Sequence, residues 1–375
     1  MMEGRDHGMP IRVLEIVTDM GRGGIETMLM NHYRQMDRTQ VQLDFLTHRS
    51  KRAVYDDEIE EMGGKLYRLP PLNPVGFNYQ KQLRNFFAQH TEYRIVHSHL
   101  DCMAGVPLKA AKEFGVPVRI AHAHNSNQTK NVKYPIKLVY KNQIEKYATH
   151  LFACGEAAGE WMFGGAPFAV MHNAIDAGKF RYQPDLRECA RKALIPEMLD
   201  AFVVGHVGSF WSPKNHLFLL DIFREIYKQE PNSVLLLVGT GGLMDEVREK
   251  AKSYGIENHV KLLGDRSDVF WVEQAMDVFV LPSLFEGLPV TMIEAQASSL
   301  PCFISEKVPI ECKVTDLVTQ ISLKAAPAVW ARQILDSRNL PRRDTSAEIA
   351  QAGFDIRENA AWLQNFYLEQ WKANE

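Results

Sequence analysis

The sequence predicts an α/β fold made of two doubly wound, parallel-sheet domains, and three observations support this prediction. Short apolar segments alternate with helical ones along nearly the whole chain, which is typical of a parallel sheet covered by helices on both faces. The alternation starts again near residue 201, so that two units of similar size follow one another. The chain has 375 residues, which is more than a single hydrophobic core usually holds.

The first unit is predicted from residue 11 onward. Residues 11–18 (IRVLEIVT) form an apolar strand, a glycine-rich loop follows, and residues 25–36 then place apolar side chains at helical spacing. The other strands expected in this half are short, and they cover residues 41–46, 94–97, 118–121 and 151–153.

The second unit repeats this pattern. We expect its strands at residues 201–206, 233–238, 260–263 and 277–281, with helices at 217–229 and 243–254. The weakly patterned residues 172–196 are the expected hinge. The predicted domains are therefore 1–177 and 178–356, and the amphipathic C-terminal stretch 357–375 is expected to pack back on the first domain.

Composition excludes several classes of protein. The net charge of -3 argues against a nucleic-acid partner, and no apolar run reaches the roughly 20 residues of a membrane-spanning helix. The N-terminal residues lack the apolar segment of a secretory signal. The 5 cysteines are scattered without a C-x-x-C pair, which favours neither a disulfide framework nor a zinc site. These features predict a cytoplasmic protein.

The strongest functional signal follows the strand predicted at residues 277–281. The loop Ser283–Pro289 (SLFEGLP) runs into an expected helix at residues 290–297. Glu286 lies in the loop and Glu294 about one turn into the helix, so both can face one ligand. Backbone N–H groups at Gly287 and Leu288, together with the helix dipole, suit an anion or a polar sugar. The sequence therefore predicts a polar ligand site at this strand end.

This segment, SLFEGLPVTMIEAQASSLP, resembles the donor-site signature of retaining GT-B glycosyltransferases of the family 4 type, which have two glutamates at this spacing. The similarity extends along nearly the whole chain and is nearest to bacterial capsule and exopolysaccharide enzymes. It implies a GT-B fold, with an acceptor-side first domain and a nucleotide-sugar donor domain facing a central cleft. The segments that carry it, in the family's order, are MGRGGIETM, RIVHSH, VMHNAIDAGKF, VGSFWSPKNH, LLLVGTGGLMDEV and VKLLGDRSDV.

The resemblance also implies roles for single residues of the second domain. Glu286 is expected to contact the hydroxyls of the donor sugar and Glu294 the ribose. The amides of Gly287 and Leu288 are expected to line the sugar and the diphosphate. Lys214 is expected to bind the diphosphate as a point charge.

Three further donor-site positions come from the same resemblance. The loop around Arg266 lies where the family's backbone contacts the nucleotide base. Gly23 and Gly24 precede the first helix, where they could cradle a phosphate or let an acceptor approach the backbone. The glycine spacing of this loop does not fit the dinucleotide motif G-x-G-x-x-G, which argues against an NAD-dependent enzyme.

One residue departs from the family pattern. The family usually has arginine directly after the glycine of its phosphate loop, whereas Ser209 follows Gly208 here. A neutral hydroxyl cannot make bidentate, charge-assisted contacts to a phosphate. This departure keeps open the alternative of a catalytically silent subunit that binds a sugar nucleotide.

Two pairs of histidines follow predicted strands: His97 with His99, and His122 with His124. Strand alternation places each pair on one face of the sheet. The family has a histidine near the donor sugar in this region, and His124 fits that position first and His122 second. His99 and His122 are expected to line the cleft on the acceptor side. No D-x-D motif is present, so no metal is expected.

A basic stretch covers residues 109–146, in which lysines alternate with Tyr134, Ile136, Leu138, Val139 and Tyr140. Such a surface could bring the enzyme to anionic lipid headgroups at the inner face of the membrane, next to a lipid-linked acceptor. A solvated helix face explains the same pattern equally well.

The resemblance to the family implies metal-independent transfer of a hexosyl group, with retention of configuration, from a nucleotide-sugar to a saccharide or lipid-linked acceptor in polysaccharide biosynthesis. UDP is the expected nucleotide, with GDP as the alternative, and no cofactor is expected. A nucleotide-sugar 2-epimerase on the same fold is a second enzymatic alternative to the silent subunit.

Overall fold

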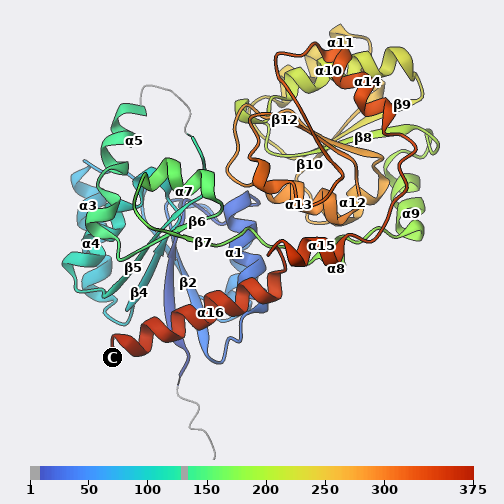
Figure 1. The fold of residues 1–375 in the computed structure, drawn as a ribbon. Helices are drawn as coiled ribbons and strands as arrows, with labels where there is room; N and C mark the ends of the chain where they lie inside the picture. The colour runs from blue at the N-terminus through green and yellow to red at the C-terminus, as the bar shows by residue number, and fades with distance from the viewer. Residues whose placement is uncertain (1–8, 128–133) are drawn as a thin grey trace, which may run out of the picture. The chain divides into compact units, whose positions relative to one another are not determined.

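The computed structural model describes residues 9–127 and 134–375, which form two compact units (Figure 1). Unit 1 comprises Met1–Asn173 together with Ile356–Glu375, and unit 2 comprises Ala174–Asp355. Each unit contains one sheet whose strands are all parallel, as the alternating sequence pattern predicts.

The sheet of unit 1 has seven strands in the order β3-β2-β1-β4-β5-β6-β7. Its central strands are buried on both faces, which explains their nearly continuous apolar sequences. The strands are β1 (Ile11–Ile16), β2 (Val41–Thr47), β3 (Leu66–Arg68), β4 (Ile95–Ser98), β5 (Val118–Ala123), β6 (His150–Ala153) and β7 (Ala169–Val170).

Helices join these strands, and the last helix of the chain returns to the same unit. The C-terminal helix α16 packs against α1 and one face of the sheet, where Leu363 and Tyr367 are buried (Figure 1). The helices of unit 1 are α1 (Gly24–Gln35), α2 (Asp56–Glu61), α3 (Phe77–Gln89), η1 (Asp101–Met103), α4 (Gly105–Glu113), α5 (Tyr134–Lys141), α6 (Ile144–Tyr147), α7 (Glu156–Phe163) and α16 (Ile356–Ala373).

The sheet of unit 2 has six strands in the order β10-β9-β8-β11-β12-β13. They are β8 (Phe202–Val207), β9 (Ser233–Val238), β10 (Val260–Gly264), β11 (Val278–Leu281), β12 (Cys302–Ser305) and β13 (Val318–Ile321). The helices are α8 (Ala177–Phe180), α9 (Pro184–Leu194), η2 (Ser212–Lys214), α10 (His216–Gln229), α11 (Met244–Ser253), η3 (Glu257–His259), α12 (Val269–Ala275), α13 (Val290–Ala297), η4 (Ile310–Cys312), α14 (Pro327–Asp336) and α15 (Ser346–Gln351).

The first boundary between the units falls within residues 172–196, where the hinge was expected, and most of this stretch forms α8 and α9. Pro184 is the first residue of α9, where its missing N–H costs no hydrogen bond. Only Ala190 and Arg191 of α9 are buried, although Leu186, Ala190, Ala193 and Leu194 recur at helical spacing. The chain passes between the units at residues 173/174 and 355/356, whereas the sequence suggested 177/178 and 356/357.

In each sheet the strand order reverses direction at one place, between β1 and β4 in unit 1 and between β8 and β11 in unit 2. In doubly wound folds the loops after two such strands lead to opposite faces of the sheet, and ligands bind at the carboxyl edge between them. The sequence-predicted site residues follow these strands, so both edges are candidate sites.

Candidate active site

The loops after β8 and β9 meet at the reversal point of unit 2. Gly239 and Gly241 have φ angles of 131° and 156°, which favour glycine. A Cβ atom on Gly241 would lie 2.6 Å from the carbonyl oxygen of Phe210, and one on Gly239 would overlap the carbonyl of Gly208. The amide of Phe210 donates to Thr240 O at 2.9 Å. The two loops therefore form a rigid, backbone-lined floor.

Lys214 and Glu286 are brought together over this floor. Lys214 lies in η2, and Asn215 directly after it adopts a left-handed conformation with φ 57° that starts α10. The Lys214 Nζ lies 2.7 Å from the Glu286 Oε1, and both side chains are largely buried. The Lys214 stem passes Gly208, where a Cβ would lie 3.2 Å from its Cδ and Cε. The ammonium therefore lies beside the loop that begins with Gly208 and Ser209.

The Glu286 loop is held by hydrogen bonds to its neighbours. The Ser283 hydroxyl donates to Glu286 Oε1 at 2.6 Å, and the Ser305 hydroxyl donates to the Ser283 carbonyl at 2.5 Å. The Leu284 amide donates to Pro213 O at 2.8 Å and thereby joins the two site loops. Lys214 and Glu286 thus keep their positions without a ligand.

The other predicted donor residues lie at the start of α13 and after β10. Gly287 and Leu288 are buried directly before the N-cap Pro289, and Glu294 lies inside the helix and is 8% exposed. Burial raises the pKa of Glu294 to about 7, and the charge of Lys179 opposes that rise. Arg266 donates to Asp268 at 2.8 and 2.6 Å, which ties its guanidinium within its own loop.

In unit 1 the four histidines gather at the carboxyl ends of β4 and β5, and all of them are buried. The rings of His97 and His122 stack at 5.2 Å, and those of His122 and His124 at 4.2 Å. Each pair lies on one face of the sheet, as alternation along a strand predicts, and the stacked rings show that both pairs share the same face. The side chains of His99 and His122, both expected to line the cleft, have no exposed surface in unit 1 and cannot be contacted by an acceptor in this conformation.

Two further side chains, Glu15 from β1 and Tyr367 from α16, link these rings into one chain of short contacts. His122 Nδ1 lies 3.1 Å from His97 Nε2, and His97 Nδ1 lies 2.7 Å from the Tyr367 hydroxyl. That hydroxyl donates to Glu15 Oε1 at 2.9 Å. Glu15 Oε2 lies 2.8 Å from His99 Nε2, and His99 Nδ1 lies 2.9 Å from His124 Nε2.

Ring nitrogens of His97, His99 and His122 lie within 4.8 Å of one another, a spacing that a metal ion could also produce. Hydrogen bonds to a neighbouring ring or to Tyr367 occupy both nitrogens of His97, and bonds to His124 and Glu15 occupy both nitrogens of His99. The hydrogen bonds alone account for the spacing, and we keep the expectation that no metal is needed.

Asp101 fixes the backbone next to His124. Its carboxylate accepts the His124 amide at 2.9 Å and the Asn125 side-chain amide at 2.6 Å. Asp101 itself has a φ of 46°, an uncommon conformation for this residue type that the two bonds hold in place. The His124 ring therefore has a defined position at the carboxyl end of β5.

The predicted glycine loop of unit 1 begins α1, with Gly23 as its N-cap. A Cβ on Gly23 would overlap the carboxylate of Glu26, so this acidic side chain lies against the helix N-terminus. Burial raises the pKa of Glu26 to about 7. A phosphate at Gly23 and Gly24 would have to displace this carboxylate or meet it in its protonated form.

Sequence reasoning did not identify Glu15, Tyr367 or Asp101 as site residues. Glu15 carried a signal, because a carboxylate within a strand buried on both faces requires polar partners. Tyr367 lies at an apolar position of an amphipathic helix and gave no such signal. Its contact with Glu15 joins residues 352 positions apart, which local patterns cannot reveal.

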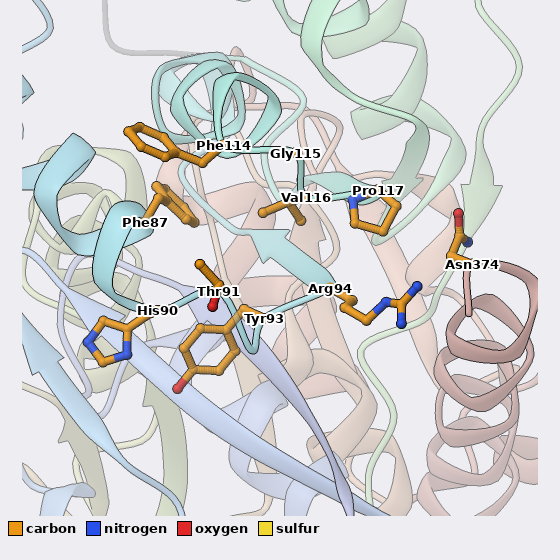
Figure 2. A pocket seen from close by; sticks show the side chains of 10 residues that line it. All are labelled: Phe87, His90, Thr91, Tyr93, Arg94, Phe114, Gly115, Val116, Pro117 and Asn374. Atoms are coloured by element: carbon orange, nitrogen blue, oxygen red, sulfur yellow. The ribbon is translucent and has the colours of Figure 1, made fainter.

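A cavity of about 470 Å³ lies at the opposite edge of the unit 1 sheet. Figure 2 shows Phe87 and Phe114 on one side of it and Arg94 and Asn374 on the other. Arg94 directly precedes β4, so the cavity lies at the amino edge, away from the histidines. Ligands in doubly wound sheets bind at the carboxyl edge, and we assign this cavity no role in the site.

The basic stretch 109–146 is only partly a free surface. The Arg119 guanidinium donates to the carbonyl oxygens of Tyr147 and Pro117 at 2.7 and 3.2 Å and is half-buried. On α5, by contrast, Ile136 and Val139 are 53% and 58% exposed. Lys130 and Lys133 lie outside the described residues. Within the described residues, no helix has both the length and the apolar character needed to cross a bilayer.

Comparisons with family models agree with this two-unit organisation. Residues 22–179 match the model described as Glycosyltransferase Family 4, and residues 201–337 match that described as Glycosyl transferases group 1. The two matches fall largely within unit 1 and unit 2, respectively.

Known proteins are similar over nearly the full chain. The putative glycosyltransferase EpsF of Bacillus subtilis is 36% identical, with 95% of this chain and 96% of the relative covered. The capsular polysaccharide biosynthesis glycosyltransferase CapH of Staphylococcus aureus is 25% identical, with 96% and 99% covered. The crystal structure of Anabaena Alr3699/HepE in complex with UDP and glucose superimposes with a TM-score of 0.76 at 16% identity, covering 97% and 100% of the two chains.

Proposed function

Because the chain belongs to the group 1, family 4 glycosyltransferases and has their GT-B fold, we propose that it transfers a hexosyl group from a UDP-sugar to a lipid-linked or free saccharide, with retention of configuration, during assembly of a bacterial polysaccharide. The family supplies the reaction class. The similarity to CapH supports a role in polysaccharide synthesis, and the UDP and glucose bound to HepE support the choice of donor.

The observation that carries this proposal is the Lys214–Glu286 pair over the floor formed by the β8 and β9 loops. A cation beside backbone N–H groups suits a diphosphate, and a carboxylate next to it can accept hydrogen bonds from sugar hydroxyls. The pair therefore joins the two recognition chemistries that a nucleotide-sugar needs. On binding, the diphosphate would pair with the Lys214 ammonium in place of Glu286, and the sugar hydroxyls would donate hydrogen bonds to the Glu286 carboxylate.

Catalysis by this site would be electrostatic and positional. Lys214 would stabilise the negative charge that develops on the departing diphosphate, and the N-terminus of α13 would add its dipole. Glu286 would hold the sugar in the orientation for attack by the acceptor. Ser209 adds no charge, so we assign the cationic role to Lys214 without a second phosphate-loop cation.

Ligand-induced stabilisation tests the donor assignment directly. We expect UDP or a UDP-sugar to raise the melting temperature, and GDP, ADP, CDP and NAD to raise it less, because a ligand that binds only the folded state stabilises it by mass action. Transfer to polyprenyl-diphosphate-linked sugars is then measured with the UDP-sugar that binds. Binding without transfer would favour the silent subunit, and donor conversion without acceptor would favour the epimerase.

Replacing Lys214 with methionine is expected to raise the Kd for UDP by roughly tenfold to 100-fold, because a charge-assisted contact to the diphosphate is lost. Titration calorimetry measures the change. Lys252→Met removes an equal charge from the exposed last turn of α11 and serves as the matched control. Equal UDP affinity in the Lys214 variant and the wild type would remove Lys214 from the donor site.

We also propose that α5 brings the enzyme to its lipid-linked acceptor. Ile136 and Val139 are exposed on this helix, which has no buried residue and also carries Lys137 and Lys141. Apolar side chains beside lysines suit the interface of an anionic bilayer. The apolar side chains would enter the headgroup boundary of the bilayer.

The double variant Ile136→Glu/Val139→Glu is expected to bind anionic phospholipid vesicles about tenfold less tightly. Two aliphatic groups that would be buried in the bilayer are replaced by negative charges that the anionic membrane surface repels. Vesicle co-sedimentation measures this binding. The control Leu199→Glu/Leu340→Glu adds the same charge at exposed apolar sites of unit 2. A loss of binding of the same size in both variants would assign the effect to net charge and exclude α5 as the docking helix.

A further inference from the structure

The buried polar chain of unit 1 has a direction that can be read from its ends. It runs without a branch from His122 through His97, Tyr367, Glu15 and His99 to His124. Each neutral imidazole has one N–H and one bare nitrogen, so each ring passes on the direction of the hydrogen bonds that it receives. The state of the central carboxyl therefore determines both ends.

When Glu15 is ionised, it accepts from Tyr367 on one side and from His99 Nε2 on the other. His99 Nδ1 is then bare and accepts from the Nε2–H of His124, which leaves His124 Nδ1 bare. The same rule on the other arm leaves Nε2 of His122 bare. Among the described residues that atom has no hydrogen-bond partner, and a bare buried acceptor costs less than a buried N–H.

Two arms of hydrogen bonds meet at Glu15: the His97 arm runs through Tyr367 and His97 to His122, and the His99 arm runs through His99 to His124. When Glu15 carries a proton, it donates into one arm, and the direction of the hydrogen bonds in that arm must reverse. Reversal of the His97 arm would place an N–H at the fully buried Nε2 of His122, where no described residue can accept it. Reversal of the His99 arm places the N–H at Nδ1 of His124, a residue that keeps 7% of its surface exposed at the end of β5. The second reversal costs less.

We propose that Glu15, acting through His99, sets the tautomer of His124, so that Nδ1 of His124 accepts a hydrogen bond when Glu15 is ionised and donates one when Glu15 is protonated. Glu15 and His99 are positioning residues in this scheme. Its catalytic consequence rests on the proposed function: if His124 contacts a substrate of the transfer reaction, it presents a lone pair or an N–H to that substrate according to the state of Glu15.

The groups that face Glu15 determine where the switch operates. They are His97 and His99 from β4 and its end, at 3.6 and 2.8 Å, and Tyr367 from α16. His122 and His124 on β5 and His32 on α1 interact electrostatically with this group of rings. Burial raises the pKa of Glu15 to about 8, and the bond from Tyr367 opposes the rise. The two states are therefore both accessible near neutral pH.

Nitrogen NMR of the ligand-free protein tests the proposal. With ¹⁵N-labelled histidine, the His124 signals are assigned by their loss in His124→Gln, and the protonated and bare ring nitrogens are followed from pH 6 to 10. We expect the wild type to exchange an Nδ1–H tautomer for an Nε2–H tautomer as the pH rises. An unchanged His124 tautomer across this range in the wild type would overturn the proposal.

Two variants separate the arms of the chain. Glu15→Gln mimics the protonated carboxyl and is expected to hold His124 as the Nδ1–H tautomer at every pH. Tyr367→Phe disrupts the other arm and is expected to keep the transition but move it to higher pH, since the Tyr367 bond lowers the pKa of Glu15. Loss of the transition in both variants, or in neither, would contradict the assigned route through His99.

The transfer reaction supplies a separate readout. Between pH 7 and 9 we expect kcat of the wild type to change by about tenfold relative to Glu15→Gln, in which the tautomer is fixed. A wild type that shows the NMR transition but transfers no sugar would contradict the proposed function and leave the coupling intact. A wild type that transfers sugar without the NMR transition would contradict the coupling alone.

Discussion

Replacing Glu286 with glutamine is expected to lower kcat for sugar transfer by roughly 100-fold to 1,000-fold, which is the usual cost of removing one preorganised polar contact at a reacting centre. The amide keeps the size of the side chain but loses the charge that pairs with Lys214 at 2.7 Å. It also accepts more weakly from sugar hydroxyls. Initial rates at saturating UDP-sugar and acceptor measure the effect.

The structure indicates that this variant will keep its fold. Glu286 lies in a loop, and the backbone of that loop is held by the Leu284 amide and the Ser305 hydroxyl, neither of which contacts the replaced carboxylate. Glu249→Gln, on the exposed face of α11, removes an equal charge from unit 2 and is the control. A Glu286→Gln enzyme with wild-type kcat would show that the sugar is oriented by other groups.

Periodicity in the sequence predicted the central strands of both sheets but missed β3, β7, β12 and β13, which lie at the sheet edges or next to them. The strand expected at residues 233–238 agrees with β9, and the segment expected after Pro289 agrees with α13. Buried parallel strands and amphipathic helices can be recognised in the sequence, because the spacing of their apolar side chains shows which face packs against the core. The positions of the loops are then given by the ends of the predicted strands.

The features that sequence reasoning missed are held by polar contacts instead. Helix α9, which lies in the stretch expected to be the hinge, is attached to unit 2 through ion pairs of Arg187 and Arg191 with Asp277. The partner that turns the four histidines into a single chain is Glu15, reached only through the fold. The sequence does not show whether a polar side chain makes its hydrogen bonds to water or to a distant residue. Such sites can therefore be recognised only in the structure.

Replacing Asp277 with alanine is expected to lower the free energy of unfolding of unit 2 by about 3–5 kcal/mol, because buried cations lose their counter-ion. The Asp277 carboxylate lies 2.5 Å from Arg187 Nη2 and 2.7 Å from Arg191 Nη2, and it accepts the Val203 amide at 2.7 Å. The Arg191 side chain is only 9% exposed. The Asp277 and Arg187 side chains are 20% and 23% exposed, so water can replace the lost carboxylate only in part.

Hydrogen exchange measured by mass spectrometry can locate this loss. Amides of β8 and β11 should exchange faster in Asp277→Ala, while those of β4 and β5 in unit 1 serve as internal references. Asp245→Ala breaks an exposed ion pair with Arg248 on α11 and should cost less than about 1 kcal/mol. Equal destabilisation by the two variants would mean that the Asp277 cluster is no stronger than a surface pair.

The location of Asp277 makes its effect on function predictable as well. It precedes β11 and bonds to Val203 near the start of β8, so it lies at the amino edge of the sheet, whereas Lys214 and Glu286 follow the carboxyl ends of the same two strands. Asp277→Ala should therefore bind UDP with wild-type affinity at a temperature where unit 2 is folded, and UDP should raise its melting temperature by a similar increment. A weakened UDP site in this variant would show that the two edges of the sheet are coupled, since no described contact joins Asp277 to the Lys214–Glu286 pair.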